Sequence, residues 1–366
     1  MPLDTLRTFA EDDIPAAAAL FGRVYPKQRW TSQAACEAYF REILLNNPWR
    51  DLDLPSWVAE EDGRMSGFAG IMPRRMLFRG RPIRVAVGCQ FMVDPNRRNG
   101  LTALQLARAA LSGPQDLFIA DGANELSRQM WTGLGGAAPL LYNLHWTRPL
   151  RPVRFALSLL EERGALSPAL ALPARPLGAL ADALAARLHP NRLDQEDAEL
   201  AEDTLDAAAM LAHLPDVADG SALQPEYDAR SLAWLLEQTA LKVRHGKLRA
   251  RAVLEGGRQR LIGWYLYYLR TGGVSEVVQI AACNGSFGRV LQRLLADAWR
   301  QGAAAVRGRL DPRHVQEFSD RQCWFRREGT WTLVHSRHAD VAAAIHQGNA
   351  FLSRLEGEWW LRFQGG

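Results

Sequence analysis

Residues 85–111 combine an apolar run, a turn and a helical repeat, and this order limits how the chain can fold. The run from Val85 to Val93 is β-branched at both ends and predicts a strand. A turn follows at residues 94–96, and from Leu101 onward leucine and alanine recur at helical spacing. The sequence therefore predicts a strand that a short loop joins to a helix.

The loop between this strand and this helix has the composition of an anion site. It reads Arg97-Arg98-Asn99-Gly100-Leu101-Thr102. The first turn of a helix exposes backbone N–H groups without intrahelical partners, and the helix dipole is positive there. Gly100 lets the backbone approach a phosphate closely, and the arginines can add charge-assisted hydrogen bonds. The loop indicates phosphate binding; the alternative is a solvated basic surface.

Length and composition bound the class of protein. A chain of 366 residues exceeds one typical domain and suggests two or three. Its 48% hydrophobic and 23% charged residues are typical of soluble globular proteins. The net charge of +4 favours an acidic partner such as a nucleotide cofactor or a carrier protein. No basic run is interleaved with stacking aromatic residues, so we expect no nucleic-acid partner.

Cysteine and histidine spacing predicts no metal site. The four cysteines are far apart and form no C-x-x-C pair: Cys36, Cys89, Cys283 and Cys323. His335 and His338 are three residues apart, but no third ligand is apparent. The N-terminus has no signal-peptide pattern and no stretch reads as a membrane span, so we expect a cytoplasmic protein.

The first 148 residues predict a regular order of strands and helices. The expected strands are 5–9, 57–60, 65–72, 85–93, 117–121 and 140–147, and the expected helices are 11–24, 32–44, 101–111 and 124–134. A turn at Asp62-Gly63 joins two of these strands in a hairpin. The last strand is expected to close this half of the chain.

This order, together with residues 93–102, resembles the GNAT acyltransferases. The motif of that family is V-x-P-x-x-[RQ]-x-x-G-x-[GA]; Val93, Pro95, Arg97 and Gly100 match it, and Thr102 replaces the usual glycine or alanine. The resemblance implies that the loop holds the pyrophosphate of acetyl-CoA or a longer acyl-CoA, and that the preceding strand pairs with the pantetheine arm. The implied binding residues are Phe91, Met92, Val93, Arg97, Arg98, Asn99, Gly100, Leu101 and Thr102.

A second stretch, residues 124–136, resembles the family pattern N-x-x-[AS]-x-x-[FL]-Y-x-x-x-G-F. Asn124 and Ser127 match it. Trp131 stands where the family often has the tyrosine that protonates the leaving thiolate. An indole N–H donates a hydrogen bond but cannot act as that acid. The resemblance therefore implies that Asn124, Ser127 and Trp131 contact the donor, and it leaves the catalytic acid unassigned.

Gln90 and Asp121 are the candidate catalytic residues. In many GNAT enzymes, an acid near the strand that corresponds to residues 85–93 deprotonates the acceptor amine, often through a water molecule. Gln90 cannot take a proton and can only orient the amine or a water. Asp121 could serve as the base, or equally cap the turn before Asn124. Cys89 could carry an acyl group only if its pKa were lowered; the alternative is a small buried hydrophobe.

The rest of the chain predicts a linker and a second unit. Residues 149–220 are rich in Ala, Leu and Pro and predict a helical linker or insertion. After it, a hairpin with an in-strand glycine, a strand, a loop and a helix recur in the order of the first half, with Gly263 corresponding to Gly67. We therefore expect an N-terminal GNAT acyl-CoA-binding domain over 1–148 and a degenerate GNAT-like domain over 221–366. The aromatic tail is expected to dock on the core rather than to act.

The predicted fold class is therefore α/β, with two GNAT-like units in tandem, each a mixed, mostly antiparallel sheet flanked by helices. The predicted function is an N-acyltransferase in which an amine attacks the thioester of acetyl-CoA, a longer acyl-CoA or an acyl carrier protein. The expected acceptor is a small-molecule or peptide amine, and no metal is expected. Whether the chain forms an oligomer stays open.

Two other functions compete with this one. A FemABX-like transferase also has two GNAT-like units but uses aminoacyl-tRNA; the retained loop at Arg97 and Gly100 argues against it. A non-catalytic acyl-CoA-binding protein is the other, and Trp131 together with the missing acid favours it.

Overall fold

The computed structural model describes the chain except residues 1–4, 27–29, 98–100, 163, 165–175, 177, 179, 183–199, 257–259 and 362–366. The described chain forms two compact units. Unit 1 comprises Met1–Asn143, Ser221–Arg244 and Glu328–Gly366, and unit 2 comprises Leu144–Gly220 and His245–Arg327. The expected boundaries at 148 and 220 therefore do not separate the two units.

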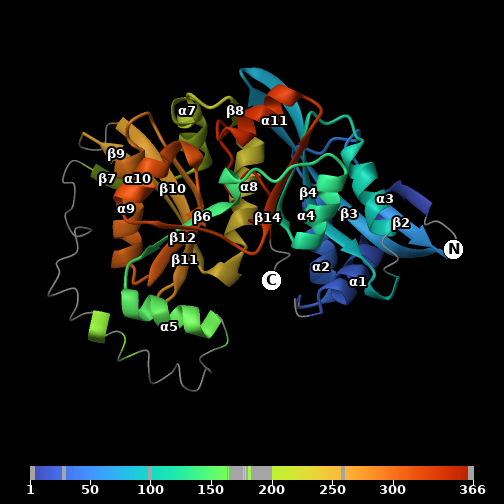
Figure 1. Cartoon of the computed structure of the whole chain (residues 1–366), viewed down its shortest axis with the longest axis horizontal. Helices are drawn as coiled ribbons and strands as arrows, with labels where there is room; N and C mark the ends of the chain where they lie inside the picture. The colour runs from blue at the N-terminus through green and yellow to red at the C-terminus, as the bar shows by residue number, and fades with distance from the viewer. Residues whose placement is uncertain are drawn as a thin grey trace. The chain divides into compact units, whose positions relative to one another are not determined.

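Unit 1 contains one mixed sheet, in the order β1-β2-β3-β4-β5-β14, with β8 paired to β3 (Figure 1). Its strands are β1 (Thr5–Thr8), β2 (Trp57–Glu61), β3 (Arg64–Phe78), β4 (Arg81–Val93), β5 (Leu117–Ala123), β8 (Leu223–Pro225) and β14 (Trp331–Ser336). Neighbouring strands run antiparallel except β4 and β5, which are parallel. The predicted hairpin, the strand at 85–93 and the mostly antiparallel character are confirmed.

Helices cover both faces of this sheet. They are α1 (Ile14–Val24), α2 (Gln33–Phe40), α3 (Leu101–Leu111), α4 (Glu125–Gly133), α8 (Ala229–Ala240) and α11 (Ala339–His346), with a π-turn at Arg41–Leu45. Phe68 of β3 meets Phe40 of α2 edge to face, at a ring-centroid distance of 5.9 Å. Ile71 shares an apolar cluster with Ala107 of α3. Because alternate strand residues face opposite ways, α2 and α3 lie on opposite faces.

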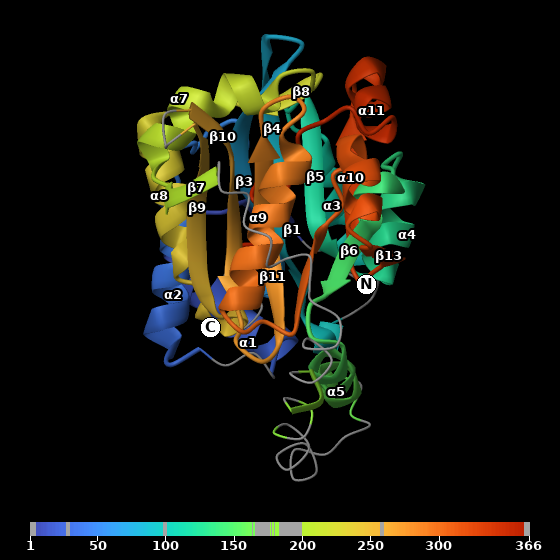
Figure 2. The same cartoon turned by 90° about the vertical axis from the view of Figure 1, so that its left-hand side faces the viewer.

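Unit 2 contains a second mixed sheet, in the order β13-β6-β12-β11-β10-β9-β7. Its strands are β6 (Leu144–Pro149), β7 (Leu200–Thr204), β9 (Lys247–Glu255), β10 (Arg260–Leu269), β11 (Val274–Ala282), β12 (Ala305–Arg309) and β13 (Trp324–Arg327). Its helices are α5 (Pro152–Glu162), α7 (Ala207–Ala218), α9 (Phe287–Arg300) and α10 (Val315–Asp320). Figure 2 shows α9 against β10 and β11, where its apolar side packs on the sheet.

Each half of the chain contributes a strand to the sheet of the other half. The strand expected at 140–147 begins at Leu144 as β6 and pairs with β12 and β13 in unit 2, so it does not close the first sheet. The place beside β5 is taken by β14 from the second half. Both exchanged strands run antiparallel to their neighbours. The described part of residues 149–220 also belongs to unit 2, where β7 pairs with β9, so it is not a separate linker.

The last described residues pack into the interior of unit 1. Phe351, Leu355 and Trp360 are buried, in agreement with the prediction that the aromatic tail docks on the core. None of the helices in the described ranges is long and apolar enough to cross a bilayer.

Candidate functional site

The two parallel strands of unit 1 separate partway along their length. β4 and β5 pair at Val85–Leu117, Ala86–Phe118 and Val87–Ile119. β4 continues to Val93 and β5 to Ala123, but the two strands do not pair with each other beyond Val87–Ile119. The backbone groups of these end segments therefore make no β4–β5 hydrogen bonds. The two strands therefore separate beyond Val87 and Ile119.

A pocket of about 690 Å³, including space open to solvent, lies where these strands separate. β4, β5, α3, α4, β14 and the C-terminal segment all contribute to it. Its lining consists of Tyr25, Ala69, Gly70, Gly88, Cys89, Gln90, Phe91, Ala110, Phe118, Ala120, Gly122, Ala123, Asn124, Ser127, Met130, Trp131, Leu333 and Glu358. The lining is mostly small and apolar, with a few polar groups, as small-molecule sites usually are.

Gln90 lies at a β-bulge in β4. The register with β3 shifts between Phe68–Met92 and Gly70–Cys89, so β4 has one extra residue there. Gln90 has a φ of 45°, a left-handed conformation that costs a non-glycine residue about 1–3 kcal/mol. Its side-chain amide is buried and donates to the Tyr39 hydroxyl, while its Oε1 has no hydrogen-bond partner among the described residues. Strained backbone of this kind clusters at functional sites.

The predicted donor-binding residues of β4 and α3 divide into three groups. Phe91 lines the pocket, whereas Met92 is fully buried beside Phe68 and Val93 pairs with Gly67. Leu101 and Thr102 open α3, Leu101 exposed and Thr102 buried. The third group is Arg98, Asn99 and Gly100, which lie outside the described residues, as does the side chain of Arg97. The phosphate cradle therefore stays a prediction.

Thr102 fits its tight position because residue 67 is a glycine. A Cβ added at Gly67 would lie 3.1 Å from Cγ2 of Thr102 and 2.7 Å from Cδ1 of Leu106. The in-strand glycine thus lets α3 pack closely against β3 while its first turn carries a threonine. This explains how the chain accommodates its departure from the family motif.

The predicted residues of α4 meet at the same pocket. Asn124 caps the helix, its Oδ1 accepting a hydrogen bond of 2.9 Å from the backbone N–H of Ser127. A cap of this kind stabilises a helix by about 1 kcal/mol, so these two matches to the family pattern have a local structural role. Trp131 is buried against Phe118, and its indole N–H has no hydrogen-bond partner in the described part of the chain.

Asp121 lies beside a residue that the sequence analysis did not single out. Its Oδ1 accepts a hydrogen bond of 2.7 Å from the backbone N–H of Glu358, and Oε1 of Glu358 accepts one of 3.1 Å from the N–H of Gly122. Both side chains are buried. Asp121 thus binds the C-terminal segment, whereas Asn124 itself caps α4. One sequence feature could have indicated Glu358: it is an acidic residue within an aromatic C-terminal segment that is expected to be buried, and a buried acid needs polar partners.

Burial dominates the electrostatics of Glu358. It raises the pKa of Glu358 well above the usual range, and the negative charge of Asp121 raises it further. The N–H groups of Gly122 and Asp121 and the charge of Lys242 oppose this increase. Burial and the Glu358 charge also raise the pKa of the Cys89 thiol, so Cys89 stays protonated and is a poor acyl carrier.

The C-terminal segment that carries Glu358 is anchored by cations over aromatic rings. Lys242 donates to the backbone carbonyl of Trp359 and lies 4.1 Å from its ring centroid. The guanidinium of Arg354 lies 4.0 Å from the same ring, and that of Arg74 lies 5.4 Å from the ring of Trp360. Such contacts contribute about 2 kcal/mol when desolvated, so together they fix the segment.

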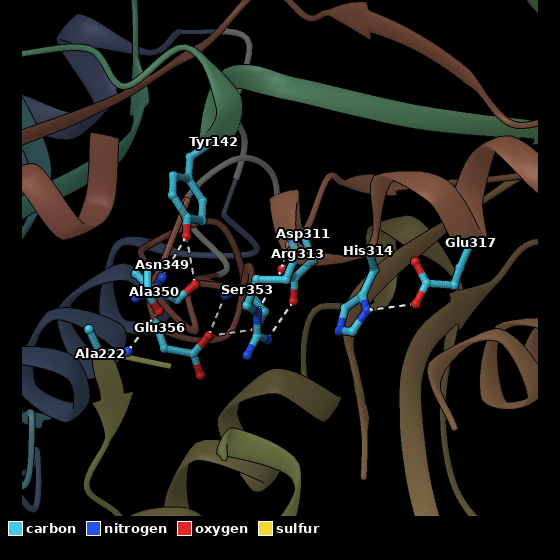
Figure 3. A network of polar contacts seen from close by, with 10 residues as sticks. All are labelled: Tyr142, Ala222, Asp311, Arg313, His314, Glu317, Asn349, Ala350, Ser353 and Glu356. Carbon is cyan, nitrogen blue, oxygen red and sulfur yellow. Dashed lines mark hydrogen bonds and ion pairs between the residues drawn. The ribbon is translucent and has the colours of Figure 1, made fainter. Parts of the chain in front are cut away.

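Polar contacts fix the start of the same segment (Figure 3). The hydroxyl of Tyr142 donates a hydrogen bond of 2.6 Å to the carbonyl of Ala350, and Asn349 accepts one of 2.9 Å from the N–H of Ala222. Glu356 accepts hydrogen bonds from the N–H and hydroxyl of Ser353, both at 2.6 Å. The segment therefore enters the core of unit 1 along a defined path.

The equivalent gap in unit 2 is filled by protein. β11 and β12 pair in parallel from Val274–Ala305 to Glu276–Arg307 and not beyond. Trp146 of β6 is fully buried there, with its Nε1 3.0 Å from the Cβ that Gly308 lacks. At the start of α9, the ring of His314 stacks on Phe287 at 3.7 Å. Buried side chains thus lie where β11 and β12 stop pairing.

No cluster of His, Cys, Asp or Glu that could hold a metal ion occurs in the part of the chain that the structure describes. Nε2 of His338 lies 2.9 Å from Oδ1 of Asp116.

Comparison with known proteins identifies the fold. No family model and no curated protein matches the sequence. Among solved structures, a probable N-acyltransferase from Enterococcus faecalis V583 has a TM-score of 0.59 at 8% identity, over 92% of this chain and 73% of that chain. GCN5-related N-acetyltransferases from Kribbella flavida and Anabaena variabilis ATCC 29413 both have a TM-score of 0.56, at 13% and 10% identity. They cover 93% and 90% of this chain and 73% and 72% of their own.

The protein is thus an α/β protein built from two mixed sheets flanked by helices. Its fold is that of the GCN5-related N-acetyltransferases, or GNAT proteins, as the sequence resemblance implied.

Proposed function

We propose that the chain is an N-acyltransferase that binds its acyl donor in unit 1 and transfers the acyl group directly to an amine. The observation that carries this proposal is the pocket at the separation of β4 and β5. A pantetheine arm carries two amide groups, and an extended amide chain can hydrogen-bond to unpaired strand backbone as an added strand does. The start of α3, beside the predicted phosphate loop, supplies the helix terminus for a pyrophosphate.

The bulge at Gln90 supports the chemical part of the proposal. A bulge removes backbone groups from the ladder, and a freed N–H beside the pocket can polarise a thioester carbonyl. The indole N–H of Trp131, which has no hydrogen-bond partner among the described residues, is a second buried donor at the same pocket. Positioning and polarisation then supply most of the acceleration for attack by a neutral amine.

The proposed donors are acetyl-CoA, a longer acyl-CoA or an acyl carrier protein, because all present the same phosphopantetheine arm. The proposed acceptor is a small-molecule or peptide amine. These substrates belong to the cytoplasm, where we propose that the protein works.

A non-catalytic acyl-CoA-binding protein is the second candidate, because Trp131 replaces the tyrosine that could serve as an acid. Release of free thiol from acetyl-CoA in the presence of a panel of primary amines separates the two. Turnover supports the enzyme, and binding without turnover supports the second candidate.

Blocking the pocket tests the site of binding. Ser127→Trp places a large ring at the pocket from the first turn of α4, and calorimetric titration should show loss of coenzyme A binding. Gln129→Trp is the matched control, because residue 129 is an exposed position of the same helix that does not line the pocket. Equal affinity in the Ser127→Trp variant and the wild type would refute the assignment.

A further inference from the structure

We propose that Asp121 and Glu358 act as one proton-handling pair in unit 1, sharing a single proton, taking the proton of the acceptor amine and returning one to the leaving thiolate. This inference rests on the proposed acyl-transfer function and adds the acid and the base that the sequence leaves unassigned.

Two hydrogen bonds hold the segments that carry Asp121 and Glu358 next to each other. The backbone N–H of Glu358 donates to Asp121, and the N–H of Gly122, the next residue of β5, donates back to the Glu358 carboxylate. Gly357 makes this approach possible, because a Cβ at that position would overlap the carboxylate of Asp121. The two carboxyl groups are therefore fixed relative to each other by backbone contacts.

Glu358, the member of the pair nearer the pocket lining, faces a site for a ligand, and Asp121 lies behind it. Glu358 lines the pocket at the strand separation. Two other lining residues, Gln90 and Trp131, are at least nine-tenths buried and each has a polar atom without a hydrogen-bond partner among the described residues. Buried polar atoms are almost always paired in native proteins, so these atoms indicate that a polar ligand completes the pocket.

The charges around Glu358 favour one shared proton. Asp121 from β5 and Lys242 after α8 act on it, and its own charge acts on the thiol of Cys89 in β4. Two buried carboxylates close together cannot both ionise without a large cost. With one proton, the pair has one negative charge, which the ammonium of Lys242 balances. The pair then contains both a base and an acid at the same pH.

The reaction balances without another group. As the amine nitrogen forms its bond to the thioester carbon, its proton passes to the ionised carboxylate, directly or through a water. The pair now holds two protons. When the carbon–sulfur bond breaks, one of them passes to the thiolate sulfur, which gives the amide, free coenzyme A and the original singly protonated pair. A tyrosine at position 131 is then unnecessary, which accounts for Trp131.

Isosteric variants test the pair. Glu358→Gln and Asp121→Asn keep the side-chain shape and remove the shared proton site. We expect each to slow thiol release from acetyl-CoA by about 10²–10⁴-fold, the usual contribution of general acid–base catalysis, with unchanged affinity for coenzyme A. Release is measured with primary amines and with water alone, because water also needs a base. Glu356→Gln is the matched control: it is a buried glutamate of the same segment that does not line the pocket.

Infrared spectroscopy gives a readout that does not depend on activity. At neutral pH, the spectrum of the wild type minus that of Glu358→Gln should contain the C=O stretch of a protonated carboxyl group. The same band should be lost in Asp121→Asn and kept in Glu356→Gln. Absence of the band overturns the proposal, as does near wild-type turnover in both isosteric variants. Failure of the wild type to bind coenzyme A would instead refute the proposed function, and the band would still report on the shared proton.

Discussion

The backbone N–H of Glu358 donates a hydrogen bond of 2.7 Å to Oδ1 of Asp121, across 237 positions of the chain. This contact ties the end of the chain to β5 beside the candidate donor pocket. It makes the C-terminal segment part of the site rather than a covering of the core alone.

Gly357→Ala should destabilise unit 1, because the new methyl group would overlap the carboxylate of Asp121. We expect the free energy of unfolding to fall by about 1–3 kcal/mol, the usual cost of overpacking. Urea denaturation monitored by tryptophan fluorescence measures the change. Gly22→Ala is the control, since an added Cβ meets nothing there and alanine stabilises a helix interior by about 0.5–1 kcal/mol. A stable Gly357→Ala variant would contradict the close approach.

Stability should depend on pH through Glu358. Its pKa is raised in the folded state, so above its ordinary value of 4.5 the unfolded chain releases a proton that the folded chain keeps. The free energy of unfolding therefore falls as pH rises from 4.5 to the raised pKa. Glu358→Gln lacks this contribution, so its stability relative to the wild type should increase over that window and then level off. Parallel stability curves from denaturation at several pH values would exclude the raised pKa.

Arg97→Ala combined with Arg98→Ala should weaken coenzyme A binding by about 2–4 kcal/mol, from the loss of charge-assisted hydrogen bonds to phosphate. Calorimetric titration measures the effect. Arg289→Ala, in the corresponding helix of unit 2, should leave the affinity unchanged, because Trp146 fills the gap of that unit. An unchanged dissociation constant in the double variant would remove the phosphate cradle from loop 97–102.

Trp146→Ala should cost about 3–5 kcal/mol of stability, as large-to-small substitutions of buried aromatic residues do. The ring is fully buried and lies against Gly308 where β11 and β12 separate. Thermal denaturation measures the loss, and coenzyme A should bind with unchanged stoichiometry. A second molecule of coenzyme A bound to this variant would show that Trp146 is what blocks a site in unit 2.

Local patterns in the sequence determined much of the fold. The hairpin at Asp62-Gly63, the strand ending at Val93 and the helix from Leu101 follow from turn residues and side-chain period, which act over a few residues. The repeated order of elements likewise predicted two mixed sheets. Residues 90, 91, 124, 127 and 131 line one pocket, because they lie on neighbouring elements of one unit.

Only the tertiary structure decided which strand closes each sheet and which acid meets Asp121. An edge strand can pair with any free edge, and its alternating pattern does not name the partner, so the exchange of β6 and β14 is absent from the local sequence signal. Glu358 is distant from Asp121 in the chain, and its role comes from burial of the aromatic tail around it. The sequence specified the elements, and long-range packing chose their partners, because contacts between distant segments depend on the whole folded chain.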